Sequence, residues 1–217
     1  MSTLSFNNIK VYNFEGAIRG MRNPMNSWKL SDSGIDEEYG LDSFTDFHIG
    51  PKDLKLAKSL IKAGTEHRKF LRQIFVCVDI TAPRYWWQEF DTYKVGTTAN
   101  SCSTMHKLQS IPFSAEMFAI DSENLENEDM NFWVNTIAYL NHLREKYNRT
   151  KDMNTFRLLK QALPESFKQL RTITFNYENM LTFERQRGKH RLKEWNEDFI
   201  GFVYSLPYAE EFIKATK

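Results

Sequence analysis

An apolar stretch with alternating side chains, at residues 70–80, constrains the fold of this chain more than any other feature. β-Branched residues at a period of two are typical of a β-strand. One face of the expected strand carries Ile74, Val76, Val78 and Ile80. Phe75 and Cys77 lie on the opposite face, so we expect both sides of the strand to be covered by the rest of the protein.

The periodicity of apolar residues divides the rest of the chain into short strands and helices. Further strands are expected at residues 9–21 and 170–175. Helices are expected from residue 51 onward and at 84–91, 122–146, 151–163, 176–186, 192–205 and 208–215. Residues 22–50 are polar and contain Asn-Pro, Ser-Gly and Tyr-Gly, which predicts a long excursion. The 217 residues contain no internal repeat and predict one α+β domain over residues 1–217, with helices in excess.

Composition argues against several classes of protein. Lysine and arginine total 29 against 28 aspartate and glutamate, so we expect no duplex nucleic acid partner. No apolar run of about 18 residues occurs, so no membrane span is expected. The first residues lack the features of a signal peptide and there are only two cysteines, which favours a reducing cytoplasm. The five histidines form no metal-ligand box, and the nine glycines form no dinucleotide or P-loop fingerprint.

Residues 92–107 form a polar segment with more hydrogen-bonding groups than a turn requires. Lys94 and Lys107 flank it, and between them lie Thr97, Thr98, Asn100 and Ser103. Loops on a rigid scaffold are common places for binding groups. The alternative is a surface connector whose hydroxyls bond to their own backbone. The residues alone leave both interpretations open.

Arg187 lies at the end of an expected helix, directly before Gly188. A cation at that position interacts favourably with the carboxyl end of the helix dipole. A guanidinium fixed there also has the fork geometry that phosphates and pyrimidine carbonyls require. The sequence supports either role.

Several segments together resemble one known family, the flavin-dependent thymidylate synthases (thymidylate synthase complementing proteins). The resemblance extends from about residue 64 to the carboxyl terminus. Its first part is Ala82-Pro83, an aromatic stretch with Gln88 and Glu89, and residues 92–106. These occupy the place of the family signature, Arg-His-Arg, two variable residues, Ser, one variable, Asn-Glu, one variable, Ser, one variable, Arg-Tyr.

The other parts of the resemblance lie toward the carboxyl terminus. Leu163-Pro164 precedes an expected strand, as in the family. A segment farther along the chain is similar to the family segment Asn-x-Arg-Ser-Leu-x-x-Phe and the arginine that follows it. Its matching residues are Asn176, Asn179, Met180, Leu181, Phe183 and Arg187. His190 and Trp195 resemble the family's His-x-Gln-Trp-Glu ending.

The chain departs from the family pattern at positions that bind ligands in the family. Aligned through Ala82-Pro83, Thr92-Tyr93-Lys94 replaces Arg-His-Arg; aligned through Asn100 without a gap, Tyr93-Lys94-Val95 replaces it, and a one-residue insertion reconciles the two alignments. Met105-His106 replaces Arg-Tyr, whereas Asn100 and Ser103 match. Thr98 replaces the signature serine, and Glu178 replaces a flavin-contacting arginine. Lys160 lies where the family often has an arginine that reaches the nucleotide phosphate. Each lost charge-assisted hydrogen bond is worth roughly 1.5–3 kcal/mol, so several losses are enough to abolish or redirect the activity.

The resemblance implies a central, mostly antiparallel sheet flanked by helices, and a homotetramer with active sites between subunits. It implies methyl or hydroxymethyl transfer to C5 of a pyrimidine nucleotide such as dUMP, with methylenetetrahydrofolate, reduced FAD and NADPH. The implied catalytic residues are Thr98, Asn100, Ser103 and Arg187. The implied flavin contacts are His67, Tyr93, Lys94, Asn176 and Asn179, and the implied nucleotide contacts are Gln88, Lys94, Ser103, Lys160 and Arg187.

An alternative is a homologue that binds a nucleotide or a protein partner without methyl transfer, which the altered triplet favours. In either case the aromatic residues at 85–90 are expected near a subunit contact, because interfaces are enriched in such residues.

Overall fold

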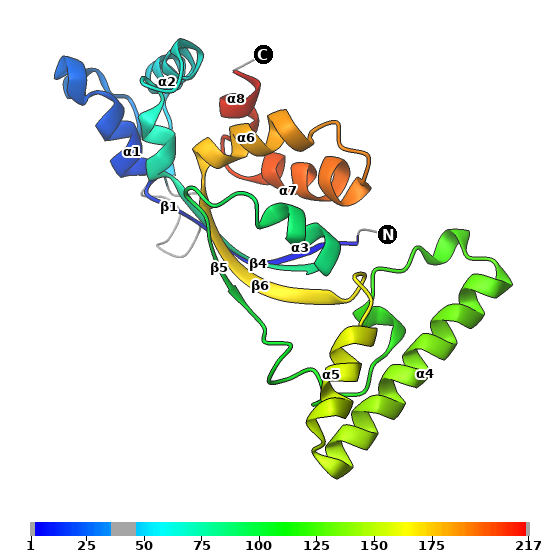
Figure 1. The fold of residues 1–217 in the computed structure, drawn as a ribbon. Coiled ribbons are helices and arrows are strands. Elements are labelled where there is room, and N and C mark those ends of the chain that lie inside the picture. Colours follow the sequence, from blue (N-terminus) through cyan, green and yellow to red (C-terminus); the bar gives the residue numbers. More distant parts are fainter. Residues whose placement is uncertain (1–2, 36–46, 216–217) are drawn as a thin grey trace.

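The computed structural model describes residues 3–35 and 47–215, and its centre is a four-stranded antiparallel sheet (Figure 1). The strand order is β1 (Ser5–Tyr12), β4 (Phe75–Pro83), β6 (Lys168–Asn176) and β5 (Thr98–Ser101). A separate two-stranded sheet joins β2 (Gly34–Ile35) to β3 (Phe47–His48). The expectation of an α+β fold with an antiparallel sheet is therefore confirmed.

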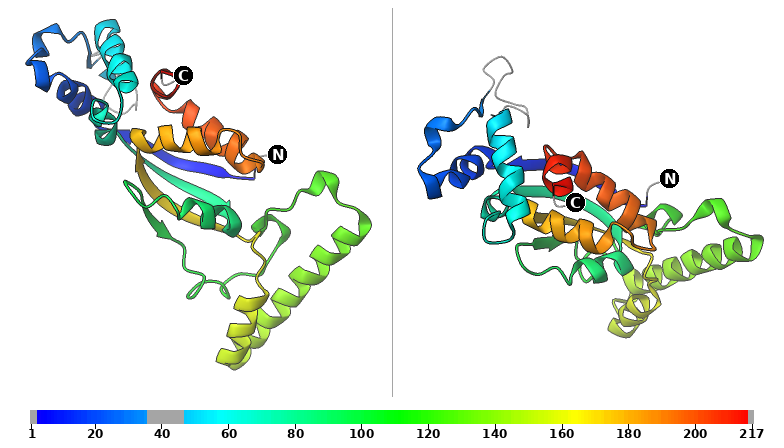
Figure 2. Two further views of the ribbon diagram at one scale, coloured as in Figure 1. Left: turned by 45° about the horizontal axis from the view of Figure 1, so that its top comes forward. Right: turned by 90° about the horizontal axis from the view of Figure 1, so that it is seen from above.

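Eight α-helices are present in the described residues. Four of them lie on the same side of the sheet, as two further views confirm (Figure 2): α3 (Arg84–Phe90), α6 (Tyr177–Arg187), α7 (Ile200–Ser205) and α8 (Ala209–Lys214). A π-helical segment, Glu194–Phe199, leads into α7. At the other end of the sheet lie α1 (Phe14–Met21) and α2 (Pro51–Ala63). The remaining two, α4 (Asn127–Thr150) and α5 (Met153–Ala162), form a separate hairpin.

Two sequence-based expectations about the strands are wrong. The strand expected at 9–21 ends at Tyr12, because Ala17, Ile18 and Met21 are buried at helical spacing on α1. The segment 92–107 contains the edge strand β5, which pairs with β6 along its whole length. Alternating hydrophobicity does not mark β5, since all four of its residues are exposed. The strand at 170–175 is confirmed as β6, and α2 begins at Pro51 as expected. Residues 36–46 of the long excursion lie outside the described residues.

Only one face of the sheet is covered within the chain, which corrects the expectation for β4. Val76, Val78 and Ile80 are fully buried beneath the helices. On the opposite face Phe75 is 41% exposed and Cys77 is half-buried. That face is largely polar: Asp79 accepts hydrogen bonds from Thr172 at 2.5 Å and from Asn8 at 2.7 Å. We refer to it as the open face.

The aromatic residues of α3 belong to the core of the chain itself. Trp86 and Trp87 are fully buried and Phe90 is 2% exposed. Trp86 stacks on Trp195 of the π-helical segment with ring centroids 4.5 Å apart. Exposed aromatic area therefore gives no reason to place a subunit contact at this helix, and a contact in this region stays a prediction.

A buried ion pair joins α1 to α2. Arg22 donates to Asp53 at 2.5 Å, and their side chains are 5% and 0% exposed. Ser31 and Ser33 also donate to this carboxylate, each at 2.6 Å. Burial by itself would raise the pKa of Asp53, but these hydrogen bonds and the charge of Arg22 lower it below its ordinary value.

We expect Asp53→Asn to lower the free energy of unfolding by roughly 3–5 kcal/mol at neutral pH, because Arg22 then keeps a buried charge without a counter-charge. The wild-type advantage is present above the ordinary aspartate pKa and is lost as pH falls through the lowered folded-state pKa. Urea unfolding at neutral and acidic pH measures both effects. Asp121→Asn, at a surface carboxylate 3.6 Å from Lys193, is the control and should have little effect. An equal deficit at all pH values would contradict the ionic explanation.

Candidate functional site

Arg187, at the last residue of α6, points toward α3 and the segment after it. Its Nε donates to the Tyr93 hydroxyl at 2.8 Å, and its terminal nitrogen lies 2.5 Å from a carboxylate oxygen of Glu89. The guanidinium also lies over the ring of Trp195, 4.6 Å from the centroid. The side chain is only 17% exposed, so it is more than a solvated helix-end cation. Its fork is filled by groups of the chain itself.

Glu89 links Arg187 to His190. The Nε2 atom of His190 lies 3.4 Å from the same Glu89 oxygen. The backbone N–H of Leu192 donates to Nδ1 of His190, so the proton of a neutral ring resides on Nε2 and faces Glu89. The Glu89 carboxylate therefore lies between two hydrogen-bond donors, Arg187 and His190. No local pattern in the sequence predicts a site role for Glu89, because its partners are about one hundred residues away along the chain.

Asn176 and Asn179 form a capping box at the start of α6. Each side chain accepts a hydrogen bond from the backbone N–H of the other residue, at 3.0 Å. Asn179 also donates to the carbonyl of Val95 at 2.8 Å and so holds the segment before β5 against α6. These amides, expected to contact flavin, already have partners within the chain.

Gly96 lies directly against this box. Its φ is +77°, and a Cβ there would lie 2.7 Å from Nδ2 of Asn176. We expect Gly96→Ala to destabilise the protein by about 1–2 kcal/mol from the left-handed backbone alone, and to increase cleavage between Tyr93 and Thr98 in limited proteolysis. Gly34→Ala, where a Cβ would meet nothing within 4 Å, is the control. Unchanged melting and proteolysis would show that the segment is not held as described.

Thr98 and Asn100 project from β5 on the open face of the sheet. The register pairs Thr98 with Thr174 and Asn100 with Thr172, and both β5 side chains are exposed in the single chain. Thr97 instead donates to the Tyr93 carbonyl within its own loop. The catalytic roles of Thr98 and Asn100 stay predictions that an assembled protein has to test.

A second group of site residues gathers where β5 leads to the helical hairpin. The Ser103 hydroxyl accepts from the backbone N–H groups of Met105 and His106, both at 3.2 Å, which is a local turn contact. The neighbouring Thr104 hydroxyl lies 2.6 Å from Nζ of Lys160 on α5, 56 residues away. The fold therefore brings together Ser103 and Lys160, two residues predicted to contact nucleotide.

Two further cationic and polar groups adjoin this place. Gln88 and Arg84, one turn apart on α3, both contact Glu165, at 2.9 and 3.1 Å. Burial, followed by the charge of Arg84, lowers the pKa of Lys160. The charges of Arg84 and Lys160 repel each other, and an anion bound between them would relieve that repulsion. The sequence did not indicate Arg84 or Thr104, although Arg84 precedes Gln88 by four residues and so shares its helix face.

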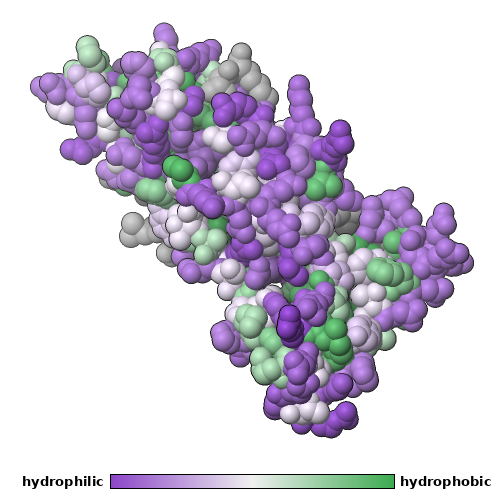
Figure 3. Space-filling view, viewed as in Figure 1, coloured by the Kyte–Doolittle hydropathy of each residue, from purple (hydrophilic) through white to green (hydrophobic). Residues whose placement is uncertain are grey.

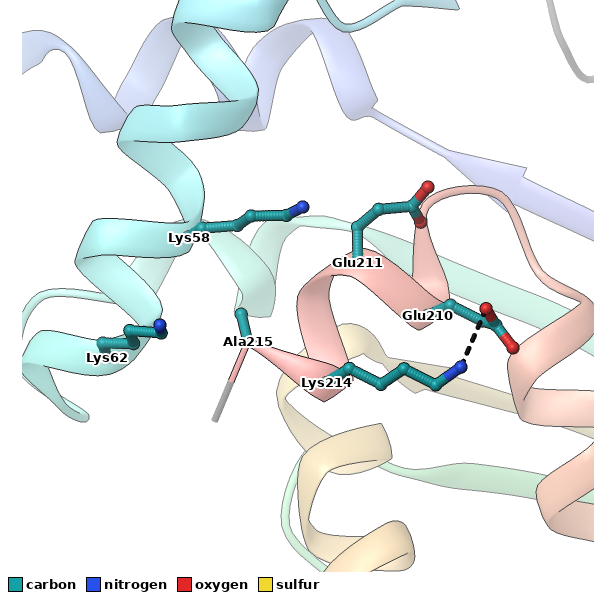
Figure 4. A pocket seen from close by; sticks show the side chains of 6 residues that line it. All are labelled: Lys58, Lys62, Glu210, Glu211, Lys214 and Ala215. Atoms are coloured by element: carbon teal, nitrogen blue, oxygen red, sulfur yellow. Dashed lines mark ion pairs between the residues drawn. The ribbon is translucent and has the colours of Figure 1, made fainter. Parts of the chain in front are cut away.

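A small cavity opens beside Ser103 and Thr104. Its volume is about 190 Å³, and its apolar lining includes Leu108, Phe113 and Phe167. Lys107 and Lys168 also line it. A larger hollow of about 390 Å³ lies between α2 and α8, where Lys58 and Lys62 point toward Glu210, Glu211 and Lys214 (Figure 4). Lys214 is paired with Glu210 at 2.9 Å, and none of the predicted site residues lines this hollow.

The other predicted flavin contacts are more scattered. His67 follows α2 and Lys94 follows α3, and both side chains are exposed. Glu178, in place of the family's arginine, pairs with Arg68 at 3.0 Å. In the described part of the chain no group of three or more histidine, cysteine, aspartate or glutamate residues is placed to hold a metal ion. None of the described helices is long and apolar enough to cross a membrane.

Comparison with known proteins shows the class of fold. No protein-family model and no curated protein matches the sequence. Two crystal structures of the flavin-dependent thymidylate synthase ThyX from Helicobacter pylori, each with FAD and dUMP, match at 18% identity. One covers 98% of this chain and 97% of its own at a TM-score of 0.68, and the other covers 100% of both at 0.69. The UMP/dUMP methylase PolB from Streptomyces cacaoi, bound with 5-Br dUMP, covers 99% of this chain and 94% of its own at 10% identity and a TM-score of 0.59.

The chain therefore has a flavin-dependent thymidylate synthase fold over its full length, in a strongly divergent sequence. The family resemblance noted in the sequence is confirmed at the level of the fold.

Proposed function

We propose that this protein binds a pyrimidine nucleotide and modifies it at C5. The observation that carries the proposal is the meeting of Lys160, Thr104 and Ser103 beside Arg84 and Gln88, in a chain with this fold. Lys160 and Thr104 would hold the phosphate, as a cation and a hydroxyl donor. Gln88 has the amide chemistry to bond a base or a sugar, and it lies on the helix face that Arg84 shares.

The finer activity that we propose is methyl or hydroxymethyl transfer to a nucleotide such as dUMP. Methylenetetrahydrofolate would donate the carbon, NADPH would reduce FAD, and the reduced flavin supplies hydride when bound. Support for the flavin comes from Lys94 and His67, which are exposed and have the charge and ring chemistry to contact it. Asn176 and Asn179 would act indirectly, by fixing the segment that carries Lys94. The proposed assembly is a homotetramer.

The second candidate is a homologue that binds a nucleotide without transferring a carbon. Two contacts favour it: Glu89 occupies the Arg187 fork, and Glu178 is paired with Arg68. Both carboxylates neutralise arginines that would otherwise be available to an anionic ligand. Under this proposal the phosphate contacts at Lys160 would remain and flavin binding would be lost.

We expect Lys160→Ala to weaken dUMP binding by at least about 1.5 kcal/mol, roughly tenfold, because a charge-assisted contact is lost. Lys160→Arg should retain most of the affinity. Calorimetric titration measures the affinity for dUMP. Lys52→Ala, a substitution of an exposed lysine on α2, is the control. Equal affinity of wild type and Lys160→Ala for dUMP would show that the phosphate does not bind at Lys160.

Flavin separates the two candidates. If the protein alkylates a nucleotide, it should take up FAD with a visible absorption band, and it should support growth of a thymidine-requiring bacterium. Stabilisation by FAD should reach about 2.7 kcal/mol at one hundred dissociation constants. Nucleotide binding with neither flavin uptake nor complementation would support the second candidate. Absence of both nucleotide and flavin binding would contradict the proposal as a whole.

A further inference from the structure

The hairpin of α4 and α5, which we call the arm, projects from the body of the molecule (Figure 1, Figure 2). It has a small core separate from the main one, with Leu140, Leu143 and Leu159 buried in it. The 24 residues of α4 make a rod about 36 Å long. Because one side of α4 packs on this small core, the other side is left to solvent.

Large apolar side chains remain exposed along α4. Met130 and Val134, one turn apart, are 53% and 65% exposed, and Phe132 and Tyr139 are 59% and 47% exposed. The hydropathy surface shows apolar patches over the arm (Figure 3). A run of exposed residues passes between these two pairs along one line of the helix: Glu128, Asn131, Asn135, Ala138, His142, Glu145 and Arg149. Their spacing alternates between three and four, which keeps them on one face.

The charges of α4 are divided between its two ends. From residue 127 to residue 143 the helix carries two acidic residues, Glu128 and Asp129, and no lysine or arginine. From residue 144 to residue 150 it carries three cations, Arg144, Lys146 and Arg149, and one carboxylate, Glu145. Among the described residues, neither Glu128 nor Arg149 has an ion pair within the chain, and both side chains are exposed.

We infer that the outer face of α4 pairs antiparallel with α4 of a second copy of this chain. A two-fold axis between Ala138 and Tyr139 would place Glu128 opposite Arg149 of the second copy, and Arg149 opposite its Glu128. The small side chain of Ala138 at the crossing permits close approach of the helices. Met130, Val134, Phe132 and Tyr139 would be covered along the two sides of the contact.

The charge pattern selects a second copy over an unrelated partner. An acidic half and a basic half on one helix are self-complementary only when the second helix is the same and runs in the opposite direction. Such an interface is isologous, with each contact formed twice. A parallel pair would bring acidic ends together and basic ends together, which is unfavourable.

Charge reversal tests this pairing on the full-length protein. Sedimentation should show wild type above the 25.7 kDa mass of one chain at micromolar concentration. Glu128→Arg or Arg149→Glu alone should raise the dissociation constant of the oligomer by at least about tenfold, because each reversal acts at two symmetric places. The double variant should return to within about threefold of wild type, and high salt should weaken only wild type and the double variant.

Glu66→Arg, at an exposed residue outside the arm, is the matched control, and melting curves check that every variant is folded. A wild-type mass of one chain overturns the inference. An oligomer that is insensitive to both single reversals also overturns it, because another surface then holds the copies together. Failure of the double variant to restore association overturns the antiparallel register.

Discussion

The nine-residue antiparallel ladder between β4 and β6 is the constraint on which the rest of the structure depends. Its register pairs Val76 with Phe175 and Val78 with Ile173, all buried beneath the helices. The same register places Asn176 at one end, where it caps α6, and Pro83 opposite Lys168 at the other, where α3 begins. A shift of one residue would turn the apolar set toward solvent. The ladder therefore fixes where both groups of candidate site residues lie.

The aromatic core above that ladder explains how the chain accommodates a cation beside it. Arg187 lies over Trp195 and contacts Tyr93, so aromatic faces replace part of its hydration. Glu89 supplies the counter-charge and His190 adds a donor to that carboxylate. The arrangement holds the end of α6 against the end of α3. In this chain Arg187 is thus a structural joint as well as a candidate ligand.

Local periodicity in the sequence was sufficient for β6, for the start of α2 and for the positions of α5 and α6, because each presents a regular buried face. It failed for β5, whose exposed residues have no alternation, and for α1, whose start at Phe14 follows directly on a strand. The open face of β4 could not be predicted from the sequence, because the identity of Phe75 does not tell whether its side chain is buried or exposed. The structure places Thr104, which follows Ser103 in the chain, 2.6 Å from Lys160, and the nucleotide-binding roles of Ser103 and Lys160 stay predictions. Two contacts of the candidate site could not be predicted from local sequence patterns. Lys160 contacts Thr104 across 56 residues of the chain, and Arg187 contacts Glu89 across 98 residues.

The contacts seen in this structure give a physical explanation for the departures from the family pattern. Two acidic residues, Glu178 and Glu89, each neutralise an arginine, and the Arg-His-Arg triplet retains only Lys94 as a cation. At the other group of candidate site residues, burial and then the charge of Arg84 lower the pKa of Lys160. Arg84 is partly balanced by Glu165, at 3.1 Å, whereas Lys160 contacts the neutral hydroxyl of Thr104. Among the described residues Lys160 forms no ion pair, so an anion would gain a contact there without displacing a carboxylate. Under the proposed function, this is why Lys160 would hold the phosphate of the nucleotide.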